Sequence, residues 1–196
     1  IIRYFDGKND YEVMSVDDMH LFGNHNYENV MAAIAMTIEA GVPLNIIINV
    51  IKDFMGVEHR IEYVRDKNGV RYYNDSKGTN PDSSIKALEA MSRPTILIAG
   101  GYDKHSEFDE FIEAFDNKVK LMVLLGQTAD KIEETAVRHG FTNIIKTDSL
   151  EKAVKICAEN AVSGDVVLLS PACASWGMFK NYEERGKLFK EYVNSL

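Results

Sequence analysis

The stretch Thr95-Ile96-Leu97-Ile98-Ala99-Gly100-Gly101 decides the fold class of this chain. An unbroken apolar run that stops at two glycines is typical of a strand buried on both faces and followed by a turn. Three further strands of this kind are predicted at 119–125, near 143–146 and at 166–170. Helical patterns lie between or beside these strands, at 81–92, 107–116, 128–139, 149–161 and about 179–193. This alternation predicts an α/β domain with a mostly parallel sheet covered by helices on both faces.

Upstream of this alternation the pattern changes. Residues 61–64 and 70–73 are predicted to be two strands joined through Asn68-Gly69, which is the strongest short signal for a hairpin because both turn residues need a positive φ. Before Gly56 we expect three short strands and two helices, at 1–5, 11–14, 19–22, about 24–40 and 44–54. The change of pattern predicts a domain boundary near Gly56–Glu58.

The composition limits the possible functions. The chain has 196 residues with 22 Lys and Arg against 30 Asp and Glu, and its formal net charge of −8 argues against a nucleic-acid groove or a contact with anionic membranes. Two cysteines are too few for a disulfide framework or a four-cysteine zinc site, and they fit a reducing, cytoplasmic environment. No apolar run is long enough to span a membrane, and no signal peptide opens the sequence. Because Ile1 begins inside a predicted strand, we expect the chain to be a piece of a longer protein.

The loops that follow strands carry the polar residues of interest, since open α/β sheets bind ligands at the carboxyl ends of their strands. Neither the G-x-x-x-x-G-K-S/T phosphate loop nor the G-x-G-x-x-G dinucleotide motif occurs in the chain. The most polar compact stretch is Asn74-Asp75-Ser76-Lys77-Gly78-Thr79-Asn80-Pro81, which ends where a helix begins and free backbone N–H groups favour anions. Lys77 adds positive charge, and Asp75 offers hydrogen-bond acceptors or a water-mediated metal contact. We therefore predict a cradle for a nucleotide or a carboxylate in this loop.

Several other residues have both a functional and an ordinary interpretation. Lys104 either holds an anionic ligand or is a solvated loop lysine, and Arg60 either contacts phosphate or lies on an ordinary surface. Asn26 and Asn29 share one helix face, where carboxamides either read a nucleobase edge or help to cap the helix. The five histidines show no spacing typical of metal ligands, so no metal site is predicted.

Taken together, these motifs resemble those of the Mur ligases of peptidoglycan synthesis. In chain order they are Gly23-Asn24-His25-Asn26-x-x-Asn29, His59-Arg60, Asn74 to Pro81, Gly100-Gly101-x-x-Lys104, and Ser170-Pro171-Ala172-Cys173-Ala174-Ser175 running to Phe179-Lys180-Asn181-Tyr182-Glu183-Glu184-Arg185-Gly186. The last motif is the most specific, and it is most similar to the branch that adds D-glutamate to UDP-N-acetylmuramoyl-L-alanine. The resemblance spans nearly the whole chain.

This resemblance implies a division of the chain. Residues 1–57 would be a strand-and-helix remnant of a central ATPase domain, and residues 58–196 would form a Rossmann-like carboxyl-terminal domain that opens with a hairpin. It implies an ATP- and Mg²⁺-dependent ligase, in which an acyl-phosphate forms on the carboxyl of the substrate and the amine of D-glutamate attacks it. The family's phosphate loop and UDP pocket are not in this chain, so we expect the chain alone to have no ligase activity.

The resemblance also implies roles for individual residues. The expected catalytic residues, near the phosphates and the reacting groups, are Lys77, Arg60 and His59. The expected nucleotide contacts are Asn26, Asn29, Arg60, Asp75 and Lys77. The residues expected around D-glutamate are Thr79, Lys104, Ser175 and Trp176, with Phe179 and Tyr182 nearby.

Two positions depart from the family's pattern, and two other functions stay open. Gly78 stands where alanine is common, which we expect to be a mild change, and Gly177 stands where an acidic residue is common. The first alternative is a folylpolyglutamate synthase-like ligase, which shares the architecture and also adds glutamate. The second is a stand-alone ligand-binding α/β domain. The motif at 170–175 favours the Mur interpretation over the first, and a test of D-glutamate binding would help to separate it from the second.

Overall fold

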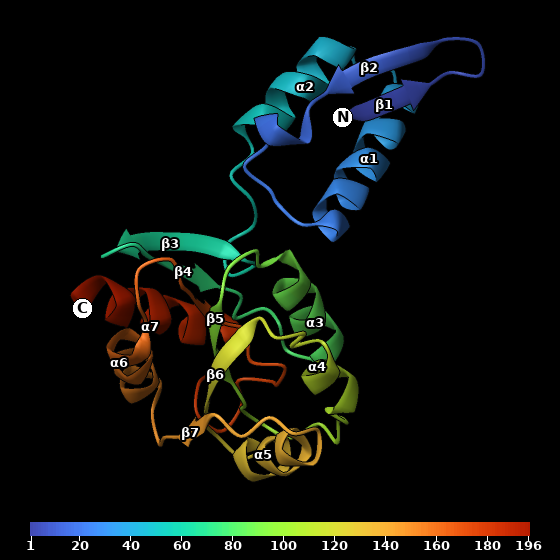
Figure 1. Cartoon of the computed structure of the whole chain (residues 1–196). Helices are drawn as coiled ribbons and strands as arrows, with labels where there is room; N and C mark the ends of the chain where they lie inside the picture. Colours follow the sequence, from blue (N-terminus) through green and yellow to red (C-terminus); the bar gives the residue numbers. More distant parts are fainter. The chain divides into compact units, whose positions relative to one another are not determined.

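The structure, a computed structural model, describes residues 1–196, which divide into two units, Ile1–Gly56 and Val57–Leu196 (Figure 1). In the first unit, β1 (Ile2–Phe5) and β2 (Asp10–Met14) form an antiparallel pair, followed by helices α1 (Asn24–Glu39) and α2 (Leu44–Asp53). These elements share a small apolar core made of Ile2, Val13, Met14, Met19, Val30, Ile34 and Ile47. The helices begin and end close to the predicted positions.

The strand predicted at 19–22 is wrong. A short 3-10 turn, Val16–Asp18, follows β2, and the Ser15 side chain starts this turn by accepting a hydrogen bond from the backbone N–H of Asp17. Residues 19–22, which follow this turn, are bends and irregular backbone and pair with no strand of either sheet. Met19 instead places its side chain in the core of the unit.

The second unit is built on one six-stranded sheet with the order β3-β4-β8-β5-β6-β7. Its strands are β3 (Glu62–Lys67), β4 (Val70–Asn74), β5 (Thr95–Ala99), β6 (Val119–Leu124), β7 (Ile144–Lys146) and β8 (Val166–Leu169). The hairpin strands β3 and β4 are antiparallel, and all other neighbours are parallel. The predicted α/β class, the mostly parallel sheet and the hairpin at its start are confirmed.

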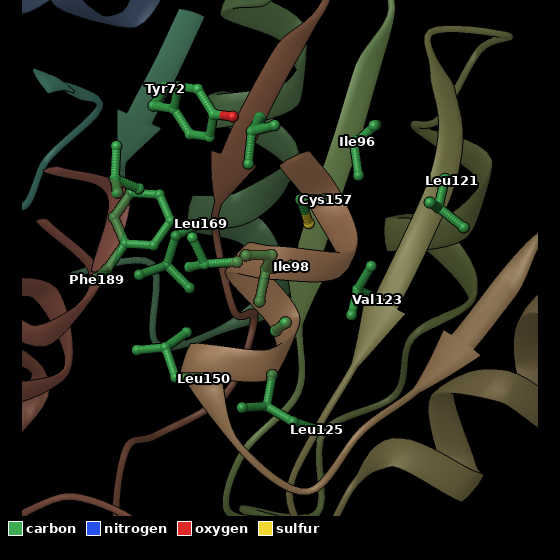
Figure 2. Packing of buried hydrophobic residues seen from close by; sticks show 14 of the residues in the cluster. Tyr72, Ile96, Ile98, Leu121, Val123, Leu125, Leu150, Cys157, Leu169 and Phe189 are labelled. Atoms are coloured by element: carbon green, nitrogen blue, oxygen red, sulfur yellow. The ribbon is translucent and has the colours of Figure 1, made fainter. Parts of the chain in front are cut away.

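Helices cover both faces of this sheet, as the apolar strands predict. They are α3 (Pro81–Ala90), α4 (Asp109–Glu113), α5 (Ala129–Arg138), α6 (Leu150–Asn160) and α7 (Tyr182–Ser195). The helices α6 and α7 contact each other, and their buried side chains pack with alternate residues of the strands into one cluster (Figure 2). Ile96 and Ile98 belong to this cluster, whereas Leu97 between them points to the other face. No helix in the structure combines the length and the apolar character that crossing a membrane requires.

The strand order brings the loops of interest to one edge of the sheet. Strand β8, the last in sequence, lies between β4 and β5, so Asn74 and Ile98 are both level with Leu169. The carboxyl ends of these three parallel strands therefore lie side by side. The loops that begin at Asp75, Gly100 and Ser170 leave the sheet next to one another.

Candidate active site

The three loops at this edge are tied together by buried hydrogen bonds. The backbone N–H of Gly100 donates to the carbonyl of Pro171 at 2.8 Å, and that of Tyr102 donates to the carbonyl of Ala174 at 2.9 Å. The hydroxyl of Ser170 donates to Asp75 Oδ2 at 2.7 Å. These contacts hold the backbone around the site before any ligand arrives, which is the preorganisation that a catalytic or binding site needs.

Asp75 lies beneath a strained turn. His59 and Ile61 have φ values of 65° and 45°. Positive φ values are unusual for residues other than glycine, and they are costly for a β-branched residue such as Ile61. The backbone N–H of Ile61 donates to Asp75 Oδ1 at 3.2 Å, and the N–H of Lys77 donates to the carbonyl of His59 at 3.0 Å. Both carboxylate oxygens of Asp75 are thus engaged by protein donors. The turn they support presents Arg60, which is exposed, beside the loop.

The buried Asp75 carboxyl predicts a pH-dependent stability. Burial raises its pKa to about 7 from 3.8, so between these values the folded state holds a proton that the unfolded state releases. Stability therefore falls as the pH rises from about 4 to 7, and the loss is complete above pH 7. Asp75→Asn should remove this pH-dependent contribution to the unfolding free energy. Between pH 5 and pH 8 the unfolding free energy of the unaltered chain should therefore fall by roughly 2 kcal/mol more than that of the variant.

Urea denaturation at both pH values measures this difference. The matched control is Asp82→Asn, because Asp82 is exposed on α3 and its replacement should leave the pH dependence unchanged. Burial lowers the pKa of His59, which has the opposite effect on stability but is common to all three proteins and cancels in the comparison. An Asp75→Asn chain with the same pH dependence as the unaltered chain would contradict the prediction.

Arg185 on α7 links the loop that begins at Asp75 to the loop that begins at Ser170. Its guanidinium is buried, and it donates to the hydroxyl of Ser76 at 3.0 Å, to the carbonyl of Ser76 at 2.8 Å and to the carbonyl of Cys173 at 3.1 Å. Burial lowers the pKa of Arg185 to about 10, so the group stays charged at neutral pH. It therefore places a buried positive charge under the loops where anions are expected to bind.

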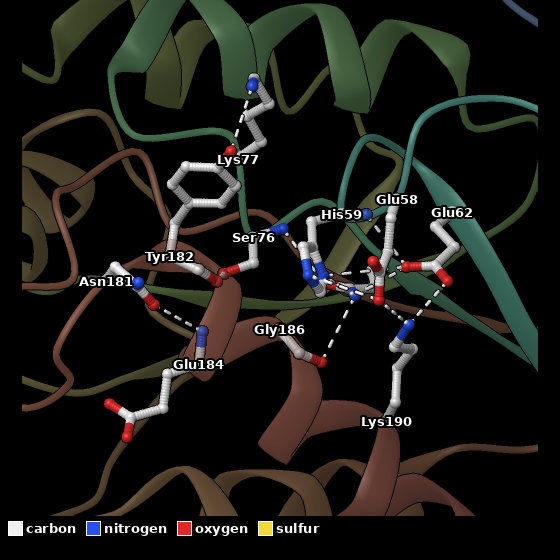
Figure 3. Close-up of polar contacts among 11 residues, drawn as sticks. Glu58, His59, Glu62, Ser76, Lys77, Asn181, Tyr182, Glu184, Gly186 and Lys190 are labelled. Atoms are coloured by element: carbon white, nitrogen blue, oxygen red, sulfur yellow. Dashed lines mark hydrogen bonds and ion pairs between the residues drawn. The ribbon is translucent and has the colours of Figure 1, made fainter.

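Lys77, Tyr182 and His59 form the centre of the candidate site (Figure 3). The ammonium of Lys77 lies 3.3 Å from the hydroxyl of Tyr182 and 4.9 Å from the centre of its ring. The ring of Tyr182 also meets the His59 imidazole edge-on, with centroids 6.1 Å apart. The structure thus brings together three residues that the sequence places up to 123 positions apart.

His59 also belongs to a cluster that has the spacing of a metal site. The ligand atoms of Glu58, His59 and Glu62 lie within 4.8 Å of one another, a juxtaposition that the histidine spacing did not predict. However, the Lys190 ammonium already bridges the two carboxylates, at 2.7 and 2.9 Å. Asn74 Nδ2 lies 2.9 Å from His59 Nδ1, so this ring nitrogen is already engaged in a hydrogen bond within the protein. The cluster is therefore an ion bridge between α7 and the turn that carries Arg60.

The remaining residues predicted in this unit differ in exposure and surroundings, and Phe179 packs against the core cluster of the sheet. Lys104 and Trp176 are exposed, Thr79 and Phe179 are half-buried, and Ser175 is buried. Trp176 packs edge-on against Tyr102, with ring centroids 5.4 Å apart. Asn80 caps the following helix, because its side chain accepts a hydrogen bond from the backbone N–H of Ser83 at 2.9 Å.

The predicted nucleotide contacts of the first unit lie on the first turns of α1. Asn26 donates its side-chain amide to the carbonyl of Phe22 at 2.8 Å, so it supports the start of the helix. Asn29 lies one turn further along and is exposed. The two carboxamides share one side of the helix, as their spacing predicts.

Sequence reasoning assigned no role to several residues that build the site. Arg185 and Ser76 lie inside the polar motifs quoted above, but their residue types and positions in the sequence do not indicate that they contact each other. The sequence predicts Asn74 only as the start of a polar loop, whereas in the structure its side chain links His59, Glu62 and the N–H of Ser76. The one available signal was spacing, because 182, 185 and 186 fall on neighbouring positions of one helix.

The position of Gly78 is more constrained than expected. A Cβ atom at this residue would lie 2.5 Å from Asp75 Oδ2 and 3.0 Å from the hydroxyls of Ser170 and Ser84. Alanine there would require the buried Asp75 carboxyl or its partners to move. Glycine at this position is therefore matched to the hydrogen bonds around Asp75, and the exchange is not the mild change predicted.

Comparison with solved structures defines the class of protein first. The fold is similar to that of a pseudomurein peptide ligase type C from Methanothermus fervidus (TM-score 0.71, 17% identity, 96% of this chain and 38% of that one). It is also similar to a UDP-N-acetylmuramate–alanine ligase from Thermotoga maritima (TM-score 0.68, 17% identity, 90% of this chain and 39% of that one). These likenesses identify the fold as one used by peptide ligases.

The sequence match identifies the family. Residues 59–173 match the family described as Mur ligase, glutamate ligase domain, and the chain belongs to that family. The chain is 65% identical over its whole length to a UDP-N-acetylmuramoylalanine–D-glutamate ligase from Lachnospira eligens, and 57% identical to the ligase of the same name from Lachnoclostridium phytofermentans. It spans 44% and 43% of the lengths of these two relatives.

Proposed function

We propose that this chain is part of an ATP-dependent ligase that adds D-glutamate to UDP-N-acetylmuramoyl-L-alanine in peptidoglycan synthesis. The observation that carries the proposal is the 65% identity to a ligase of that name over all 196 residues. We infer that residues 1–57 are the end of the central ATP-binding domain and that residues 58–196 are the carboxyl-terminal domain. The place of action would be the cytoplasm.

The chemistry of the carboxyl edge supports this proposal. An acyl-phosphate and a dicarboxylate amino acid are both anionic, so the site needs fixed positive charge and hydrogen-bond donors. Arg60, Lys77 and the buried Arg185 supply that charge, and Lys104 lies on the next loop. We assign Lys77, Arg60 and His59 to the reacting groups. We assign Thr79, Lys104, Ser175, Trp176, Phe179 and Tyr182 to the D-glutamate side.

The nucleotide would be ATP with Mg²⁺. A structural relative, the MurF ligase from Thermotoga maritima, was solved in complex with ADP. In this chain we assign Asn26 and Asn29 to the adenine, and Arg60, Asp75 and Lys77 to the nucleotide loop. Because both oxygens of Asp75 accept hydrogen bonds from the protein, its contribution would be to hold the turn of Arg60. The phosphate loop and the groups that hold Mg²⁺ would lie in the part of the relatives that this chain does not cover.

A direct assay tests the proposal. A protein of the relatives' full length that contains this chain should form ADP only when UDP-N-acetylmuramoyl-L-alanine and D-glutamate are both present, and mass spectrometry should detect the amide product. The 196-residue chain alone should be inactive. Turnover by the chain alone, or a full-length protein that ignores D-glutamate, would contradict the proposal.

The folylpolyglutamate synthase alternative has one observation in its favour. The fold is also similar to a bifunctional folylpolyglutamate synthase/dihydrofolate synthase from Yersinia pestis (TM-score 0.70, 13% identity, 96% of this chain and 43% of that one). Supplying L-glutamate with a folate in the same assay separates the two ligases. We expect no product from that pair of substrates.

A further inference from the structure

The contact between Lys77 and Tyr182 is unlike the other lysine contacts near the site. Lys190 is neutralised by two carboxylates, whereas Lys77 rests on a neutral phenol, 3.3 Å from its hydroxyl and over its ring. A flexible four-carbon side chain loses freedom in such a contact, and the phenol brings no carboxylate to neutralise the ammonium. The ammonium is therefore held in place and still attracts an incoming anion.

We propose that Tyr182 is a positioning residue for Lys77, and that its hydroxyl and ring hold the ammonium toward the reacting groups. This inference rests on the proposed function, which assigns Lys77 to those groups. It adds a role for Tyr182 that acts through Lys77 and does not require a contact with D-glutamate.

The surroundings of Tyr182 make it a rigid support. It is the first residue of α7, and Asn181 caps that helix by accepting from the N–H of Glu184 at 2.8 Å. The backbone carbonyl of Tyr182 accepts from the hydroxyl of Ser76 at 2.8 Å, so the residue is fixed to the loop that carries Lys77 (Figure 3). Its ring also meets the His59 imidazole edge-on. Backbone and ring are thus fixed separately, which leaves the hydroxyl at a defined place.

Two substitutions separate the hydroxyl from the ring. Tyr182→Phe removes only the hydroxyl and should lower kcat of the full-length ligase about three- to tenfold, with a smaller change in the KM for D-glutamate. Tyr182→Leu also removes the ring and should lower kcat about ten- to a hundredfold. Tyr192→Phe, on the same helix but packed against the core of the sheet, should have the kcat of the unaltered protein. If Tyr182 only supported the fold, the Tyr182→Phe protein would keep the full kcat of the unaltered protein. That result would overturn the proposal.

A second measurement needs no ligase activity. In the 196-residue chain, brief labelling with trinitrobenzenesulfonate followed by mass spectrometry reports how available each lysine amine is. Tyr182→Phe should raise the labelling rate of Lys77 at least twofold and leave that of Lys104 unchanged. Faster labelling of Lys77 beside an inactive full-length protein would reject the proposed function and keep the role of Tyr182. Equal labelling of Lys77 in both chains would overturn that role, even in an active ligase.

Discussion

Replacing Lys77 with methionine should lower the rate of D-glutamate addition by about a hundred- to a thousandfold in a full-length ligase that contains this chain. Methionine keeps an unbranched apolar stem but removes the ammonium beside Tyr182, and loss of one preorganised charge or donor in a site of this kind costs about that much. Since Lys77 is half-exposed, the unfolding free energy should change by less than about 1 kcal/mol. Steady-state kinetics and urea denaturation of the same protein measure both effects.

The matched control for this experiment is Lys155→Met. Lys155 is exposed on α6 and forms an ion pair with Glu151 at 2.6 Å, one helical turn away. The Lys155→Met substitution removes the same charge from the protein, but at a distance from the carboxyl edge of the sheet. The ligase rate should therefore stay within about twofold of that of the unaltered protein. A Lys77→Met enzyme that retains more than a third of its activity would show that Lys77 does not act on the reacting groups.

Replacing Gly100 with alanine should destabilise the chain by about 3 kcal/mol or more. Gly100 has a φ of 100°, a conformation that side chains rarely adopt, and a Cβ there would press against the backbone carbonyl of Leu125. Neither group has freedom to move, because the N–H of Gly100 donates to Pro171 and the N–H of Leu125 donates to Ala99. The midpoint of urea denaturation measures the loss.

Gly140→Ala separates the two causes of this loss. Gly140 also has a positive φ, 84°, but a Cβ there would meet nothing within 4 Å. Its replacement should therefore cost only the conformational strain, about 1 kcal/mol. If Gly100→Ala lost no more stability than Gly140→Ala, the close approach of the loops after β5 and β6 would not be a constraint on this fold.

Most element positions could be predicted because they depend on local patterns. The predicted strand at Thr95–Ala99 matches β5, since every residue in it is buried and an unbroken apolar run is the direct record of that burial. The strand wrongly predicted at 19–22 also follows from such a local apolar pattern. Apolar residues there serve the core, but pairing requires a neighbouring strand that the sequence pattern does not specify.

The start of the last helix shows that two local signals, the helical periodicity and the side-chain cap, can disagree. The sequence predicts the last helix from about Phe179 to Val193. In the structure the helix begins at Tyr182, since Asn181 supplies the side-chain cap and the preceding residues form turns. A cap residue near the expected start is a better guide here than the periodicity alone.

The sequence by itself determined the α/β class, most of the strands and helices, and the polar loops that end at helix starts, because each depends on residues that are near one another in the chain. Only the tertiary structure decided that β8 lies between β4 and β5. That order brings Ser170 to Asp75, Arg185 to Ser76 and Tyr182 to Lys77, pairs separated by 95 to 109 residues. Such contacts depend on how the whole sheet packs, and no local pattern of side chains records that packing.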